Sequence, residues 1–167
     1  MELIKRIINT LEKIKIEYLI EKYGKEYRIP QHIIKAIIKV ESNFNSDAMR
    51  YEPDYKWLKL PLDKYHYNEA TEEVSQKTSW GLMQVMGAVA REKGFEGNYL
   101  SKLLKPQIGI KYGCKHLYSY YKKYNSWEDA ISSYNQGSPR TNDEGEYENQ
   151  EYVDKVLHYA DQYKKKG

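Results

Sequence analysis

The helical period of the apolar residues is the feature that most constrains how this chain folds. Along most of its 167 residues, large apolar side chains recur every three or four positions, as on one face of an α-helix. This period covers residues 3–23, 30–44, 82–94, 106–124 and 150–164, with a shorter stretch at 126–136. The apolar–polar alternation typical of a half-buried strand is not evident. The sequence therefore predicts an all-α fold, and its length fits one domain.

The first of these segments predicts an amphipathic helix that stops near Gly24. Its apolar face holds Ile4, Ile7, Ile8, Leu11, Ile14, Tyr18 and Leu19. We expect residues 1–24 to pack on a motif-bearing core of about residues 30–160, within a single domain spanning 1–167; docking on a partner is the alternative. Charges interrupt the segment every few residues, so we expect neither a signal peptide nor a membrane span.

Residues 45–79 differ from the rest of the chain. They contain Pro53, Pro61 and many polar residues and tyrosines, and only a weak helical pattern around 68–74. We expect a long irregular loop, and loops of this length in compact domains tend to be functional.

Composition excludes several classes of function. The net charge of +3 is small and the lysines form no stripe, so we expect no nucleic-acid partner. The single cysteine, Cys114, excludes an internal disulfide. The four histidines lack the spacing of metal ligands, so we assign neither a metal nor a cofactor. The oligomeric state cannot be read from the sequence.

Glu41 breaks the pattern of the second helix. Helical spacing places it on the same face as Ile34, Ile37 and Ile38. A carboxylate on that face is desolvated, which raises its pKa and suits it to protonate a glycosidic oxygen. The alternative is that Glu41 lies at a frayed helix end and reaches solvent.

Four motifs occur in order along the chain and carry a resemblance to a known family. They are Val40-Glu41-Ser42-Asn43-Phe44-Asn45, Gly81-Leu82-Met83-Gln84, Ser133-Tyr134-Asn135-Gln136-Gly137 and Asn149-Gln150-Glu151-Tyr152-Val153. Together they resemble the motifs of the Slt-type lytic transglycosylases, a branch of the lysozyme-like superfamily. The resemblance implies a goose-lysozyme or Slt-type helical domain that acts on the bacterial cell wall. The third motif departs from the family's Ala-Tyr-Asn-Ala-Gly, and the long insert at 49–79 is similar to phage- and prophage-associated versions.

The resemblance implies that Glu41 is the single catalytic acid and base. It would cleave the β-1,4 bond between N-acetylmuramic acid (MurNAc) and N-acetylglucosamine (GlcNAc) in peptidoglycan glycan strands, and leave a 1,6-anhydro-MurNAc end. The substrate-binding residues implied are Ser42, Met83, Gln84, Tyr134, Asn135 and Tyr152. For each of them a structural role in packing, capping or surface polarity remains the alternative.

Two other functions remain open from the sequence. A carboxylate of the insert facing Glu41 would activate water and make the protein a hydrolytic muramidase. The candidates are Glu52, Asp54, Glu72 and Glu73, although we expect these four carboxylates to be solvated loop charges. A non-catalytic cell-wall-binding module is the third reading, and the presence of Glu41 on the apolar face argues against it.

Overall fold

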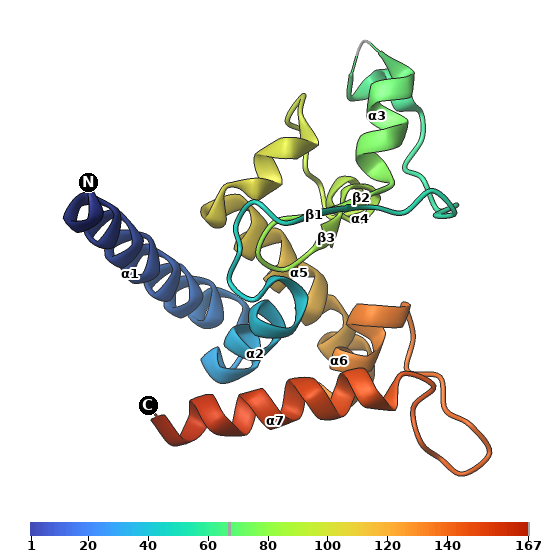
Figure 1. Ribbon diagram of the computed structural model, residues 1–167. Coiled ribbons are helices and arrows are strands. Elements are labelled where there is room, and N and C mark those ends of the chain that lie inside the picture. Colours follow the sequence, from blue (N-terminus) through green and yellow to red (C-terminus); the bar gives the residue numbers. More distant parts are fainter. Residues whose placement is uncertain (67, 167) are drawn as a thin grey trace.

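A computed structural model of the chain describes residues 1–66 and 68–166 (Figure 1). The fold is all-α, with one small sheet. The helices are α1 (Glu2–Tyr27), α2 (Gln31–Ser42), α3 (Glu69–Gln76), α4 (Gly87–Glu92), α5 (Pro106–Tyr124), α6 (Trp127–Gln136) and α7 (Gln150–Lys166), and two short 3₁₀ turns cover Leu62–Lys64 and Leu100–Leu104. The strands are β1 (Met49–Tyr51), β2 (Thr78–Trp80) and β3 (Val85–Met86). The predicted helices over 30–44, 106–124, 126–136 and 150–164 are therefore confirmed to within a few residues.

The core forms where the apolar faces of the long helices meet. In α2, Ile34, Ile37 and Ile38 are fully buried, because the spacing of three and four places them on one face. This helix packs along α7, and α5 packs against both α1 and α6 (Figure 1). The end of α2 is thereby held against the start of α7, which fixes the position of Glu41.

Helix α1 packs on the domain only through its second half. There Ile16, Leu19, Ile20 and Tyr23 are buried against α2 and α5. The first half extends away from the other helices (Figure 1), and the predicted apolar face from Ile4 to Tyr18 is exposed. The prediction that this face packs on the core is wrong except at Leu19, because the other buried side chains, Ile16, Ile20 and Tyr23, lie on a different face of the same helix.

The 45–79 insert is more ordered than the sequence indicates. Its β1 pairs with β2, which in turn pairs with β3, in an antiparallel sheet with Met49 opposite Trp80 and Ser79 opposite Met86. The weak helical pattern is α3, whose N-cap Asn68 accepts a hydrogen bond from the Thr71 amide at 2.9 Å. Strands of two or three residues are too short to show alternation, which is why the sequence missed the sheet.

The predicted helix over 82–94 is wrong in its first part. Residues 81–84 form a tight turn between β2 and β3, and α4 begins only at Gly87. Gly81 has a φ of 69°, and a Cβ there would lie 2.6 Å from the Leu103 carbonyl oxygen. Only glycine fits this close approach without a backbone shift, so the turn is fixed by its first residue.

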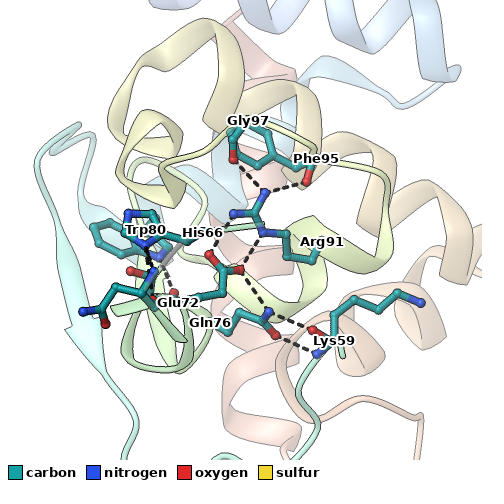
Figure 2. A network of polar contacts seen from close by, with 10 residues as sticks. Lys59, His66, Glu72, Gln76, Trp80, Arg91, Phe95 and Gly97 are labelled. Atoms are coloured by element: carbon teal, nitrogen blue, oxygen red, sulfur yellow. Dashed lines mark hydrogen bonds and ion pairs between the residues drawn. The ribbon is translucent and has the colours of Figure 1, made fainter. Parts of the chain in front are cut away.

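A buried ion pair holds α3 against α4 (Figure 2). The Arg91 guanidinium donates to both carboxylate oxygens of Glu72, at 2.7 and 2.9 Å, and to the Phe95 and Gly97 carbonyls. Gln76, also fully buried, donates to Glu72 and exchanges two hydrogen bonds with the backbone of Lys59. Glu72 is thus a structural charge, not the solvated loop charge that we expected.

Two hydrogen bonds fix the start of α6. Ser126 accepts a hydrogen bond from the Asp129 amide, as an N-cap does. The Asp129 carboxylate accepts a 2.6 Å hydrogen bond from the Tyr147 hydroxyl. This contact ties the 138–149 loop to α6. Within the described residues, no helix is both long and apolar enough to cross a bilayer.

Candidate active site

Glu41 lies in the last turn of α2 and lines a hollow of about 420 Å³. The hollow is walled on one side by the insert, through Arg50, Glu52, Tyr55 and Trp57. Its other side is formed by Gln84 of the 81–84 turn and by Tyr134 and Asn135 of α6. The predicted carboxylate of α2 therefore faces a cleft whose other walls come from the insert, the 81–84 turn and α6.

The surroundings of Glu41 favour its protonated form. Burial against the apolar face of α2 raises the pKa of this carboxyl, and it does so against two weaker opposing effects. The Tyr152 hydroxyl donates a 2.6 Å hydrogen bond to Oε1, and Arg50 contributes a nearby positive charge; both favour the carboxylate. The carboxyl group of Glu41 thus holds its proton to a higher pH than an ordinary glutamate does, a property that suits a general acid.

Two tyrosines, Tyr152 and Tyr134, lie near this acid. Tyr152 comes from α7 and contacts Glu41 directly. Tyr134 lines the cleft, while its hydroxyl donates a 2.7 Å hydrogen bond to the Met83 carbonyl. The charge of Glu41 and burial together raise the pKa of both tyrosines well above the ordinary value, with burial the larger cause. Both phenols therefore remain neutral hydrogen-bond donors.

Asn135 and Gln84 present amide groups to the cleft. Asn135 is exposed at the end of α6, and its Oδ1 accepts a hydrogen bond from Asn149, 3.0 Å away. Gln84 has a φ of 46°, and its amide nitrogen donates to the carbonyls of Ala48 and Gly81. It lies on a turn and not on the helix that the sequence predicted, yet it still reaches the cleft.

Met83 and Ser42 contribute to packing and hydrogen bonding around the cleft and do not line the hollow at Glu41. Met83 is fully buried and packs against Gly113, so its side chain does not reach the cleft; the expected contact of Met83 with sugar is wrong. The Ser42 hydroxyl donates a 2.8 Å hydrogen bond to the Leu82 carbonyl. It therefore ties the end of α2 to the 81–84 turn and positions Glu41 relative to Gln84.

The insert supplies the cleft residues that the sequence did not assign. Arg50, Tyr55 and Trp57 line the hollow beside Glu41, and Arg50 forms an ion pair with Glu52. The sequence showed only that this long insert is rich in aromatic and charged residues. It contained no periodic pattern that would indicate which of these residues face the cleft. Of the four acidic candidates, Glu52 and Asp54 line the cleft, whereas Glu72 is buried with Arg91 and Glu73 pairs with Lys77 at the surface.

The hydrogen bond from Tyr152 predicts a shift in the pH dependence of activity. Replacing Tyr152 by phenylalanine removes a donor that favours the charged carboxylate, so the pKa of Glu41 should rise further. An acid must be protonated to act, and the fall of kcat/KM on the alkaline side should therefore move to higher pH. Replacing Arg50 by glutamine should move it in the same direction. The measurement is the pH–rate profile on solubilised glycan strands, and a shift to lower pH in either variant would contradict this electrostatic picture.

A helical domain with a desolvated carboxyl group in an open, polar and aromatic cleft has the groups that acid–base cleavage of a glycosidic bond requires. Comparison with protein-family models identifies a transglycosylase SLT domain over residues 18–156, and the chain belongs to this family. It is a peptidoglycan lytic transglycosylase that acts on the bacterial cell wall, so an enzyme and not a non-catalytic binding module.

Proposed function

We propose that this enzyme cleaves the MurNAc-β-1,4-GlcNAc bond without water and leaves a 1,6-anhydro-MurNAc end. The observation that carries the proposal is the state of Glu41: one desolvated carboxyl, hydrogen-bonded by Tyr152, at the wall of the cleft. A single acid is sufficient when the nucleophile belongs to the substrate itself, because no second carboxylate has to hold a water molecule.

In the proposed steps Glu41 acts twice, first as the acid and then as the base. The carboxylic acid gives its proton to the bridging oxygen as the bond from that oxygen to C1 of MurNAc breaks, and the GlcNAc side leaves as an alcohol. The Glu41 carboxylate then takes the proton of the MurNAc C6 hydroxyl as that oxygen bonds to C1. Glu41 ends protonated, as it began, and no water is consumed. Asn135 and Gln84 are the groups that we propose hydrogen-bond the sugar substituents beside the bond.

Mass spectrometry of peptidoglycan digests tests this proposal. Products that are lighter than the hydrolytic ones by one water, and resistant to borohydride reduction, are expected. Products with reducible MurNAc ends would overturn the non-hydrolytic reaction.

A hydrolytic muramidase is the second candidate, favoured by the presence of Glu52 and Asp54 in the same cleft as Glu41. The ion pair between Glu52 and Arg50 argues against it, since this carboxylate is already engaged. Glu52→Gln and Asp54→Asn variants, made one at a time, separate the two reactions. Hydrolysis through either carboxylate predicts that its variant loses about a hundredfold or more in rate, whereas our proposal predicts the same anhydro products from both variants at a rate changed by less than about tenfold.

We also propose that residues 1–167 form a single domain. One continuous core cluster draws on side chains from α1 to α7, which supports this division.

A further inference from the structure

The aromatic residues of the insert lie where two hollows of the cleft join. Besides the hollow at Glu41, a second hollow of about 700 Å³ runs on from it, lined in part by Val89, His116, Tyr120 and Arg140. Trp57 and Tyr55 line both hollows, as do Gln84, Tyr134 and Asn135. Glu41 lines only the first. A linear polymer that occupies both hollows must therefore pass between the insert and the end of α6.

The side chain of Trp57 is strongly exposed to solvent. Its side chain is 76% exposed, the largest exposed fraction of any tryptophan or tyrosine among the exposed large hydrophobic residues. Its ring meets that of Tyr55 edge to face, with 5.5 Å between the centroids. Tyr55 is partly buried, and this ring contact supports the indole of Trp57. The indole itself is exposed to solvent in the cleft. An exposed indole with a fixed neighbour is suited to stack on the C–H face of a sugar ring.

The segment that carries Trp57 is fixed at both ends. The Glu52 amide donates a 2.8 Å hydrogen bond to the Lys77 carbonyl. At the other end, the buried Gln76 amide binds both the N–H and the carbonyl of Lys59, and Gln76 is itself held by the Glu72–Arg91 pair (Figure 2). The buried polar network therefore restrains the segment that carries Trp57. Because this segment is already ordered, it loses little conformational freedom when ligand binds.

We propose that Trp57 and Tyr55 form a saccharide-binding site in the insert, which stacks on a pyranose ring of the glycan strand beyond the sugars at Glu41. This site rests on the proposed function, since it needs a glycan strand in the cleft. It binds an additional sugar of the substrate and takes no part in the chemistry. Short substrates that end before the junction of the two hollows gain nothing from it.

Binding measurements on the inactive enzyme test the site. In a Glu41→Gln background, peptide-free strands of alternating GlcNAc and MurNAc, from two to eight sugars long, are titrated by calorimetry. Trp57→Ala should raise Kd about tenfold for the longer strands, as loss of one aromatic stacking contact implies. The Kd of the shortest strands should be unchanged. Trp57→Phe should restore part of the loss, and Lys56→Ala, an exposed neighbour, should have no effect.

The outcomes separate this inference from the proposed function. Equal binding of all lengths by Trp57→Ala and its parent would overturn the sugar site and leave the function of Glu41 untouched. Equal weakening at every length would also overturn it, because the effect would not belong to an outer sugar. If the Glu41→Gln parent bound no strand of any length, the proposed function itself would fail, and the site with it.

An independent observation concerns α1, which has two apolar faces. The buried face of its second half and the exposed face of its first half point about 150° apart around the helix axis at 100° per residue. The exposed residues Ile4, Ile7, Leu11, Ile14 and Tyr18 follow the spacing 3-4-3-4, which is that of the a and d positions of a coiled coil. This stripe is thus a helix-pairing seam, and not a continuation of the surface that packs on the domain.

The residues that flank this stripe favour pairing of α1 with a second copy of the same helix in parallel orientation. In a parallel pair, each g position meets the e position five residues later on the partner helix. Leu3 then meets Ile8, so apolar residues face apolar ones. Glu17, which also forms an ion pair with Lys35 of its own chain, meets Lys22, so opposite charges face each other. An antiparallel pair in which Thr10 lies opposite its own copy places Leu3 against Glu17 instead. We infer that α1 forms a parallel two-helix coiled coil between two copies of this chain, with the catalytic domains on the outside.

Sedimentation equilibrium at micromolar concentrations tests the dimer. The wild-type chain and Lys13→Glu, a change on the polar face, should be dimeric, and Leu11→Glu should be monomeric with an unchanged melting temperature. An Ile4→Cys variant should oxidise to a disulfide-linked dimer, because only a parallel pair brings the two copies of residue 4 together. A monomeric wild type, or a Leu11→Glu variant that stays dimeric, would overturn the seam, and a monomer that binds anionic vesicles through α1 would assign this face to a membrane surface instead.

Discussion

Replacing Glu41 by glutamine should lower the turnover of peptidoglycan by at least about a hundredfold, the usual contribution of a general acid. The amide has nearly the same shape but cannot donate a proton to the bridging oxygen, so binding should survive while kcat falls. The measurement is the release of soluble fragments from purified cell walls. Glu151→Gln removes an exposed carboxylate next to Tyr152 and is the matched control, with a rate close to that of wild type.

The stability of the Glu41→Gln variant distinguishes lost chemistry from lost folding. The pKa of Glu41 is raised in the folded state, so the folded protein binds a proton that the unfolded chain has already released over the intervening pH range. The free energy of unfolding of the wild type should therefore fall as pH rises through this range, and the variant should lack this loss. A variant that melts below the wild type at neutral pH, or that keeps full turnover, would contradict the assigned role.

Replacing Glu72 by glutamine should destabilise the protein by about 3–5 kcal/mol, because it leaves the Arg91 cation buried without its countercharge. Both side chains are almost wholly inaccessible, and the pair joins α3 to α4 (Figure 2). The next residue offers a matched control: Glu73 pairs with Lys77 in a more exposed position, and Glu73→Gln should cost no more than about 1 kcal/mol. Equilibrium denaturation with urea compares the two variants.

The same comparison tests the link between the buried network and the cleft. If Glu72→Gln and Glu73→Gln had the same free energy of unfolding, the network would not be the support of the insert. We expect Glu72→Gln also to weaken binding of long glycan strands, since Gln76 and the Lys59 backbone depend on this pair.

The sequence was sufficient to predict the long helices and the position of Glu41. The three- and four-residue spacing of apolar side chains marks α2, α5 and α7, and the same spacing places Glu41 on the apolar face of α2. This spacing shows which side chains share a face of a helix, but not whether another element covers that face. For this reason the exposed stripe of α1 was expected to be buried.

Other features depend on contacts between distant residues. Glu72 and Arg91 are 19 positions apart, and nothing local in the sequence indicates that they pair. Met83 and Gln84 are neighbours in one motif, yet the tight turn at Gly81 buries the first and directs the second to the cleft. The cleft residues Arg50, Tyr55 and Trp57 belong to a segment whose path is set by pairing with β2 and by the Gln76 side chain.

The pKa of Glu41 is the quantity on which this account depends most directly. It can be measured by carbon-detected NMR titration of glutamate side-chain carboxyls, with the Glu41 signal assigned by its absence in Glu41→Gln. We predict a midpoint clearly above about 4.3, the ordinary value for glutamate, and a further rise in Tyr152→Phe. A midpoint at or below the ordinary value would show a solvated carboxylate and contradict the proposed acid.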